Sequence, residues 1–181
     1  MAKADLSAKW LETPIGPLLV VASDTHLHAI EFHDEEAPPE PALRIGRKLG
    51  AIIRMDGDSP ALAQAMDELR YYFLGKSAQF HVPLFYDGSE FERRVWEQLL
   101  LVPLAETCSY GDIARALDQP SAARAVGEAN HVNRIPIIIP CHRCIGADGS
   151  LTGYGGGLWR KKWLLRHEGQ MRPVGLFAEG F

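Results

Sequence analysis

The sequence predicts an α+β protein with two units: a small sheet with helices in the first half, and a mostly helical second half that contains a helix-turn-helix. Short runs of strand-forming residues fill the first third of the chain, separated by Pro and Gly turn signals. Beyond residue 89, apolar residues recur at helical spacing instead. Hydrophobic residues make up 46% of the chain and charged residues 23%, values typical of a globular protein. No apolar run is long enough to cross a bilayer, so we expect no membrane partner.

The first half predicts a supporting unit without a chemical site. Strands are expected at residues 8–13, 17–23, 27–33, 50–55 and 79–84, with a proline-rich loop at 35–41 and helices at 42–48 and 61–73. Ser59 is a suitable N-cap for the second helix because Pro60 follows at its first position, and Gly75 ends that helix. The histidines of this half have no cysteine beside them, so they indicate surface or strand positions rather than ligands.

The second half predicts three short helices in succession. The first runs over residues 90–102, with Ser89 as its cap and an apolar stripe that includes Leu100, and the second covers 110–117. After a turn, Ser121 is expected to cap a third helix over 122–129, which is rich in alanine and carries Arg124 on its first turn. Two helices joined by a short turn are typical of DNA-binding proteins, although many such pairs are simply packed helices.

Charge and cysteine content point to the same half of the chain. The net charge is −4, yet residues 115–166 carry eight basic side chains against three acidic ones. This excess predicts either a basic face for phosphate or an unevenly charged solvated surface. The three cysteines Cys108, Cys141 and Cys144 cannot form a closed disulfide framework, which indicates a reducing compartment and hence the cytoplasm.

Residues 135–145 contain the strongest chemical signal. A β-like run of isoleucines, expected to be buried, ends abruptly at Pro140-Cys141-His142-Arg143, which fixes the direction of the thiol. His142 is suited to accept the thiol proton, and Arg143 adds positive potential that favours a thiolate. On these residues alone, a buried structural cysteine beside a chance histidine is an equal alternative.

Three other interpretations of this segment are weaker. The Cys-x-x-Cys spacing of Cys141 and Cys144 occurs in redox and zinc sites, but Cys108 and His167 form no second paired motif, and a turn rather than a helix follows. A Cys-His hydrolase normally takes its histidine from a distant position. We therefore expect neither a metal nor a cofactor.

At this point the chain resembles a known family. Residues 137–169 (IIIPCHRCIGADGSLTGYGGGLWRKKWLLRHEG), with the upstream segments SYGDIARAL and AARAVGEAN, resemble the O6-alkylguanine-DNA alkyltransferases across residues 89–169. The first half is similar more weakly, through the order of its elements and the segment ELRYYFLGK. The resemblance implies a ribonuclease-H-like supporting domain (1–86), an alkyl-acceptor domain (89–169) and a tail (170–181). It also implies single-turnover transfer of an alkyl group, such as methyl, from O6 of a flipped-out guanine to Cys141, with O4 of thymine as a further substrate.

The resemblance also assigns roles to individual residues. Cys141 corresponds to the acceptor, His142 to the base that reaches the thiol through a water, and Glu168 to the carboxylate that orients and charges the histidine. Tyr110 corresponds to the tyrosine that donates a proton to the departing guanine, and Asn133 to the asparagine that links the recognition helix to the reactive segment.

The same resemblance implies that a monomer binds the minor groove of double-stranded DNA. Arg124 corresponds to the arginine that fills the space left by the flipped base, on a helix surface whose small residues are Ser121, Ala123, Ala125 and Gly127. The expected substrate pocket contains Tyr154, Gly155, Gly156, Cys144 and Pro136. Arg160, Lys161 and Lys162 are candidates for phosphate contact, or for a solvated helix face.

Two residues depart from the family pattern. Cys144 stands where members usually have valine, and Gly155 stands where some have serine. The rival interpretation is a binding module that flags alkylated guanine without repairing it. Relatives of that kind lack the acceptor cysteine, so Cys141 argues against this alternative.

Overall fold

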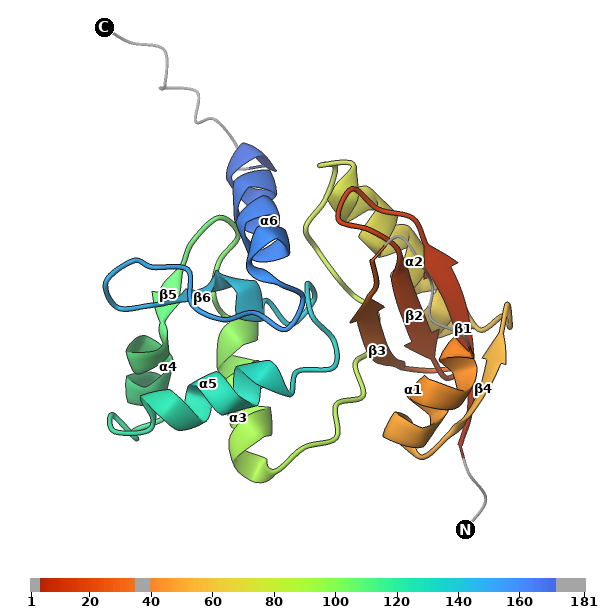
Figure 1. Cartoon of the computed structure of the whole chain (residues 1–181), viewed down its shortest axis with the longest axis horizontal. Coiled ribbons are helices and arrows are strands. Elements are labelled where there is room, and N and C mark those ends of the chain that lie inside the picture. The colour runs from red at the N-terminus through yellow and green to blue at the C-terminus, as the bar shows by residue number, and fades with distance from the viewer. Residues whose placement is uncertain (1–3, 35–39, 172–181) are drawn as a thin grey trace, which may run out of the picture.

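The first half of the chain folds around a four-stranded sheet. A computed structural model describes residues 4–34 and 40–171 (Figure 1). The strands β1 (Asp5–Leu11), β2 (Leu18–Ala22), β3 (Leu27–Phe32) and β4 (Ile52–Met55) are ordered β3-β2-β1-β4. The pairs β1–β2 and β2–β3 are antiparallel and β1–β4 is parallel. The predicted proline-rich loop lies mostly outside the described residues, as does nearly all of the tail.

The central strand β2 is buried on both faces because a helix covers each side of the sheet. Leu18, Val20 and Ala22 point into the larger apolar cluster, which includes α2 (Pro60–Phe73), while Leu19 and Val21 pack toward α1 (Pro41–Leu49). This alternation follows from the two-residue repeat of a strand. The α+β class predicted from the sequence is confirmed.

Helix α2 begins and ends as its residues predict. The Ser59 side chain accepts a hydrogen bond from the backbone N–H of Leu62, and Pro60 occupies the first turn. Gly75 follows the helix with φ of +69°, a left-handed conformation that glycine adopts without steric cost. The prediction of a strand at 79–84 is wrong, because the Glu68 carboxylate accepts hydrogen bonds from the backbone N–H groups of the residues at 81 and 82. Only an isolated bridge from Leu84 to β3 remains there.

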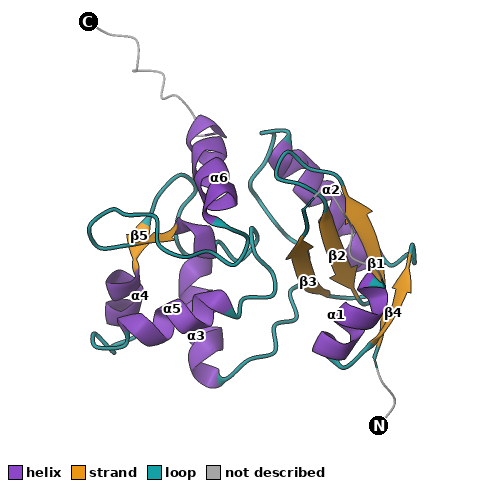
Figure 2. Cartoon of the chain, viewed as in Figure 1, coloured by secondary structure: helices purple, strands orange, loops and turns teal. Residues whose placement is uncertain are grey.

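The second half is mostly helical, as Figure 2 shows. Its elements are α3 (Glu90–Leu100), β5 (Cys108–Ser109), α4 (Tyr110–Ala116), α5 (Ala123–His131), the short 3-10 helix η1 (Cys141–Arg143), β6 (Cys144–Ile145) and α6 (Leu158–Met171). A capping box of Ser89 and Glu92 starts α3, whose Val95, Trp96 and Leu99 are buried. Leu100, predicted on the same stripe, is 41% exposed. The helices α4 and α5 form the predicted helix-turn-helix.

Two local predictions in this half are wrong for identifiable reasons. Helix α5 begins at Ala123 with Ala122 in the cap position, so Ser121 does not cap it. The turn before α5 includes Asp118 with φ of +59°, and the helix begins one residue later than predicted. Residues 135–139 are buried as expected, but they form a turn rather than a strand, with Ile137 at φ of +76°.

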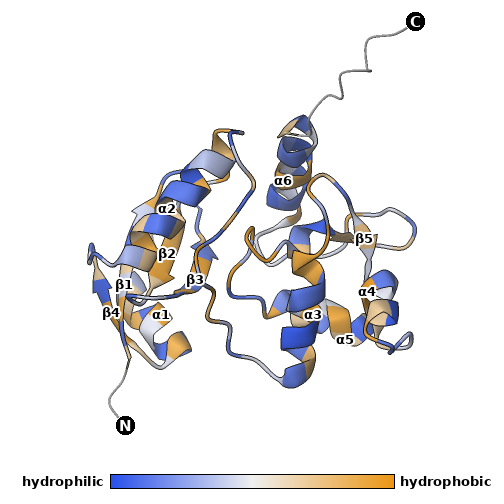
Figure 3. Cartoon of the chain, turned by 180° about the vertical axis from the view of Figure 1, so that it is seen from behind, coloured by the Kyte–Doolittle hydropathy of each residue, from blue (hydrophilic) through white to orange (hydrophobic). Residues whose placement is uncertain are grey.

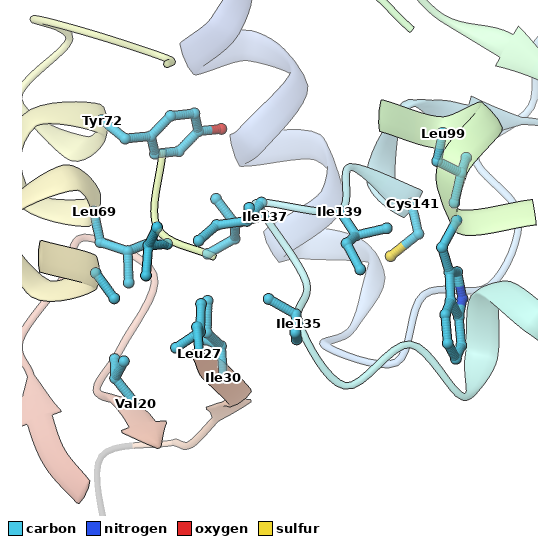
Figure 4. Packing of buried hydrophobic residues seen from close by; sticks show 14 of the residues in the cluster. Val20, Leu27, Ile30, Leu69, Tyr72, Leu99, Ile135, Ile137, Ile139 and Cys141 are labelled. Atoms are coloured by element: carbon cyan, nitrogen blue, oxygen red, sulfur yellow. The ribbon is translucent and has the colours of Figure 1, made fainter. Parts of the chain in front are cut away.

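One apolar cluster joins the two halves. Figure 4 shows Leu27, Ile30 and Leu69 of the first half packed toward Ile135 and Ile137, with Cys141 at the far side of the cluster. Figure 3 shows hydrophilic and hydrophobic residues on both α2 and α3, as amphipathic helices require. Within residues 4–34 and 40–171, none of the helices has the length and apolar character needed to cross a bilayer. The cluster therefore fixes the Cys141 segment against the sheet.

Candidate active site

An amide side chain contacts the Cys141 thiol. Asn133 Nδ2 lies 3.1 Å from Cys141 Sγ and 3.0 Å from the carbonyl oxygen of Ile139, and it donates to both. The other end of the amide, Oδ1, accepts from the backbone N–H of Ile135 at 2.9 Å. Asn133 thus satisfies both ends of the isoleucine turn and contacts the sulfur. This arrangement explains why the turn needs no strand partner.

Burial keeps the thiol protonated in the resting protein. Cys141 is 6% exposed, and this burial raises its pKa to about 11, although the hydrogen bond from Asn133 acts to lower it. The sequence predicted a thiolate stabilised by the positive charge of Arg143. The Arg143 guanidinium instead binds Glu168 and the carbonyl oxygen of Val102. Cys141 therefore needs a base to become a nucleophile near neutral pH.

Such a base lies next to it in the sequence. His142 is completely buried, and its Nε2 lies 2.8 Å from Glu168 Oε1. Burial lowers the pKa of His142, with Glu168 opposing the shift, so the imidazole is neutral at neutral pH. A neutral ring that donates through Nε2 carries its lone pair on Nδ1. Nδ1 is buried and has no hydrogen-bond partner among the described residues.

Glu168 is the centre of a buried network at the end of α6. Arg143 donates to it twice, from Nε to Oε2 and from Nη2 to Oε1, both at 2.9 Å. The hydroxyl of Tyr72 also donates to Oε1, at 3.0 Å. Burial acts to raise the pKa of Glu168, but the hydrogen bonds from His142 and Arg143 outweigh it and hold the pKa at about 2. The carboxylate is therefore charged throughout the physiological range.

The thiol borders two cavities on opposite sides of the loop that follows β6. The larger, of about 670 Å³, lies between α4, α5 and this loop, with Tyr110, Gly127, Tyr154 and Gly155 in its walls. The smaller, of about 280 Å³, faces the sheet of the first half. The larger volume falls within the range of small-ligand pockets, so a nucleobase-sized group can approach Cys141 from the helical side.

The walls of the larger cavity supply a hydrogen-bond donor. Tyr110 starts α4, and its hydroxyl accepts from Thr152 Oγ1 at 2.9 Å. Burial raises the pKa of Tyr110, so its own proton remains available for donation. Gly127 of α5 faces the tyrosine ring, since a β-carbon there would lie 3.8 Å from it.

The loop that follows β6 forms one wall of the larger cavity, here called the loop wall, and it packs against the first half of the chain. A β-carbon on Gly156 would lie 2.6 Å from the ring of Phe32, so only glycine fits without a shift. The ring of Tyr154 also packs on Phe32, with centroids 5.8 Å apart. The sheet thus sets the position of the loop beside Cys141.

Both halves of this architecture match known proteins. Residues 90–170 match the DNA-binding domain of 6-O-methylguanine DNA methyltransferase, and residues 8–86 match its ribonuclease-like domain. The chain belongs to this methyltransferase family. The methylated-DNA--protein-cysteine methyltransferase of Mycobacterium bovis is 41% identical over 92% of this chain and 94% of its own length.

Solved structures agree with the family assignment. The O6-methylguanine methyltransferase of Mycobacterium tuberculosis is 40% identical, with a TM-score of 0.78 over 94% of this chain and 97% of its own. The OGT of the same organism in complex with DNA is 39% identical, with a TM-score of 0.77 over 93% of this chain and 96% of its own.

Most residues that the sequence assigned to the site converge around the thiol. The larger cavity is bordered by Tyr110, Ala123, Arg124, Gly127, Cys141, Tyr154 and Gly155. The smaller one is bordered by Asn133, Pro136 and Gly156, and again by Cys141, Tyr154 and Gly155. Ser121 and Ala125 border neither cavity. Cys144 also lies outside both linings; it is on β6, opposite Cys108 of β5 in the strand register, and both thiols are free.

Two of the three basic residues expected either to contact phosphate or to lie on a solvated helix face are structural instead. Arg160 is 6% exposed, and it donates to the carbonyl oxygens of Ile15, His33 and Gly156. Lys161 is fully buried and donates to the carbonyl oxygens at positions 144 and 152. Lys162 is exposed and remains a candidate. The basic excess of this half therefore overstates its basic surface.

Sequence reasoning missed Tyr72 and Thr152. Thr152 stands two residues before Tyr154 with no pattern to mark it. Tyr72 lies on the apolar face of α2, where it reads as a core aromatic. The available signal was its hydroxyl, because a buried phenol requires a hydrogen-bond partner.

Proposed function

We propose that this protein repairs DNA by direct reversal, moving an alkyl group such as methyl from O6 of a flipped-out guanine to Cys141. The observation that carries the proposal is a thiol at the wall of a base-sized cavity, with the neutral imidazole of His142 and the charged Glu168 packed behind it. A cysteine of high pKa beside a neutral histidine can be activated when a substrate arrives. O4 of thymine presents a similar alkylated oxygen and is a further substrate of this proposal.

The proposed transfer is a displacement at a saturated carbon. The thiol proton passes through a water molecule to Nδ1 of His142, and Glu168 stabilises the imidazolium that results. The sulfur then attacks the alkyl carbon, so that an S–C bond forms as the O6–C bond breaks. The electron pair of the broken bond goes to the guanine, which takes a proton from the Tyr110 hydroxyl. The thioether has no route back to a thiol, so each molecule acts once.

The base must leave the duplex before this reaction, at a cost of about a few kcal/mol. Arg124 lies at the mouth of the larger cavity with its side chain 95% exposed, and its nearest acid, Glu128, is 3.6 Å away. We propose that it enters the space that the guanine leaves. The small residues of α5, with Ser121 before it, allow the helix to enter the minor groove. Asn133 then couples this helix to the thiol.

We further propose a division of labour along the chain. Residues 1–86 form the supporting domain, residues 89–169 bind DNA and carry the chemistry, and residues 170–181 are the C-terminal tail. The protein works as a monomer on double-stranded DNA without metal or cofactor. Its place is the cytoplasm, where reducing conditions keep the thiol of Cys141 available.

Intact-mass measurement after incubation with a duplex containing O6-methylguanine tests the proposal. Wild-type protein should gain the mass of one methyl group in place of one hydrogen, and Cys141→Ala should gain nothing. Cys108→Ala is the matched control, since it removes a half-buried thiol outside both cavities and should still gain one methyl. An unchanged wild-type mass, or methylation of the Cys141→Ala protein, would refute it.

A further inference from the structure

A tyrosine from the first half of the chain reaches the catalytic network. Tyr72 lies near the end of α2, is completely buried, and donates its hydroxyl to Oε1 of Glu168 at 3.0 Å. The same oxygen lies 2.8 Å from His142 Nε2 and 2.9 Å from Arg143 Nη2. Figure 4 shows the Tyr72 ring pointing from α2 toward α6.

Packing fixes this hydroxyl as a permanent donor. The ring of Tyr72 contacts the rings of Phe73, Phe80 and His167, with centroids 5.2 to 5.7 Å apart. Burial and the charge of Glu168 raise the pKa of Tyr72 well above its usual value, so the phenol stays protonated. The His167 ring in turn contacts the Tyr72 carbonyl oxygen, at 2.6 Å. The hydroxyl therefore cannot turn away from the carboxylate without repacking α2 against α6.

We propose that Tyr72 is a positioning residue that sets the proton affinity of His142 by sharing the charge of Glu168. This inference rests on the proposed function, in which His142 is the base. Each donor at Oε1 withdraws electron density from the oxygen that the imidazole faces. Without the hydroxyl, Glu168 attracts an imidazolium more strongly, and His142 holds its proton to higher pH.

Titratable groups from three elements surround His142, and Glu168, Arg143 and Lys161 are the charged ones. Glu168 and Lys161 face it from α6, and its neighbours Cys141 and Arg143 lie on η1. Tyr72 acts from α2, through Glu168. Of the two groups that donate to Glu168 besides the histidine, Arg143 carries a charge whose removal would leave a buried carboxylate poorly paired. The tyrosine hydroxyl is neutral, so it adjusts the charge of the carboxylate without adding to the net charge of the network.

The functional consequence concerns the resting state. A protonated His142 cannot accept the thiol proton, so a base that stays neutral down to lower pH keeps the protein competent over a wider range. By this reasoning the first half does more than support the second, because one of its side chains tunes the base.

The test compares Tyr72→Phe with Tyr71→Phe. Tyr71 is the neighbouring residue on α2 and is 52% exposed, whereas Glu168 is fully buried, which makes Tyr71 a matched control. NMR titration of the His142 imidazole should show a pKa raised by about 0.5 to 1 unit in Tyr72→Phe and unchanged in Tyr71→Phe. In single-turnover transfer to Cys141, the midpoint of the acid limb of the pH–rate profile should shift to higher pH by the same amount. At pH values below this midpoint the transfer rate should fall about three- to tenfold, with little change at higher pH.

A second variant guards against a simple loss of folding. Replacing Tyr72 with 3,5-difluorotyrosine keeps the ring and strengthens the donor, so the His142 pKa should move in the opposite direction, downward. Tyr72→Phe that lowers the melting temperature yet leaves the His142 pKa and the acid limb in place would overturn the inference. The imidazole titration needs no methyl transfer, so failure of the wild-type protein to accept a methyl group would count against the proposed function alone.

Discussion

The high pKa of Cys141 makes a quantitative prediction about its reactivity outside the repair reaction. Burial raises this pKa from 9.0 to about 11, so the thiol should behave as an unreactive group toward reagents that bring no base and no binding energy. The perturbation is a change of pH, followed by alkylation with iodoacetamide. Cys108→Ser is the protein to use, because Cys108 is only half-buried and its hydrogen bond with Cys144 lowers its pKa.

The expected magnitude follows from the fraction of thiolate. At pH 7.5 a thiol of pKa about 11 is ionised in about one molecule in 3,000, against about one in 30 for the ordinary value of 9.0. This hundredfold deficit is partly offset, since the more basic thiolate is about tenfold more nucleophilic. Folded Cys141 should therefore react about tenfold more slowly than Cys141 in the urea-unfolded chain. Restricted access would slow it further without moving the midpoint in pH.

Peptide mass spectrometry gives the rate at Cys141 separately from that at Cys144, which is fully buried. The rate at Cys141 should rise with pH across the whole interval from 7 to 10. A plateau reached at or below pH 8.5 would refute the reasoning, because it would show a thiolate already stabilised in the resting protein. The Cys141 thiol would then be activated already in the free protein, and not only when DNA binds.

Three further predictions concern DNA insertion, the buried carboxylate and the loop wall. Arg124→Ala should slow repair of duplex DNA at least about tenfold but leave the reaction with free O6-benzylguanine unchanged, because only a flipped base leaves a space to fill. Equal losses with both substrates would contradict the role of Arg124. The pKa of Glu168 is depressed from 4.5 to about 2, so its carboxylate contributes stability above pH 4.5 that is lost as the pH falls through 2. That contribution is about 3 kcal/mol. When the pH is lowered, the free energy of unfolding in urea should therefore decrease by about this much less in Glu168→Gln than in wild type; equal decreases would count against the prediction. Gly156→Ala places a β-carbon 2.6 Å from Phe32 and should cost about 1 to 3 kcal/mol in thermal unfolding. Gly155→Ala meets no atom within 4 Å, so identical melting of the two variants would contradict the packing argument.

Local signals predicted the elements that depend on local energetics. The Ser59 cap and Pro60 start α2 where expected, and the isoleucines before Cys141 are buried as predicted. The strand expected at 79–84 failed because a side chain distant in the sequence, Glu68, satisfies its backbone donors. The strand expected over the isoleucines failed for the same kind of reason, since Asn133 replaces a strand partner. The pattern of apolar residues predicts burial well, but it does not show which groups will form hydrogen bonds with the backbone N–H and C=O groups.

The candidate site divides in a similar way. Cys141 and His142 are adjacent in sequence, and the resemblance supplied Glu168, which the structure places 2.8 Å from the imidazole. The roles of Arg160 and Tyr72 depend on tertiary contacts instead. Arg160 donates to carbonyl oxygens as far back as Ile15, and no spacing rule connects an arginine on α6 to a turn in the first sheet. Charge counted along the chain thus included cations that are buried and bind carbonyl oxygens.

The way in which Asn133 binds also creates a chemical vulnerability. Hydrolysis of its amide to a carboxylate, the usual ageing reaction of asparagine, would exchange the donor that faces Ile139 and Cys141 for an acceptor. A negative charge would then lie about 3 Å from the sulfur, oppose formation of the thiolate and repel the carbonyl oxygen that closes the turn. Deamidation of Asn133 would inactivate a molecule that has not yet reacted with alkylated DNA. An intact Asn133 amide is therefore a condition for the proposed transfer, in addition to an unmodified Cys141.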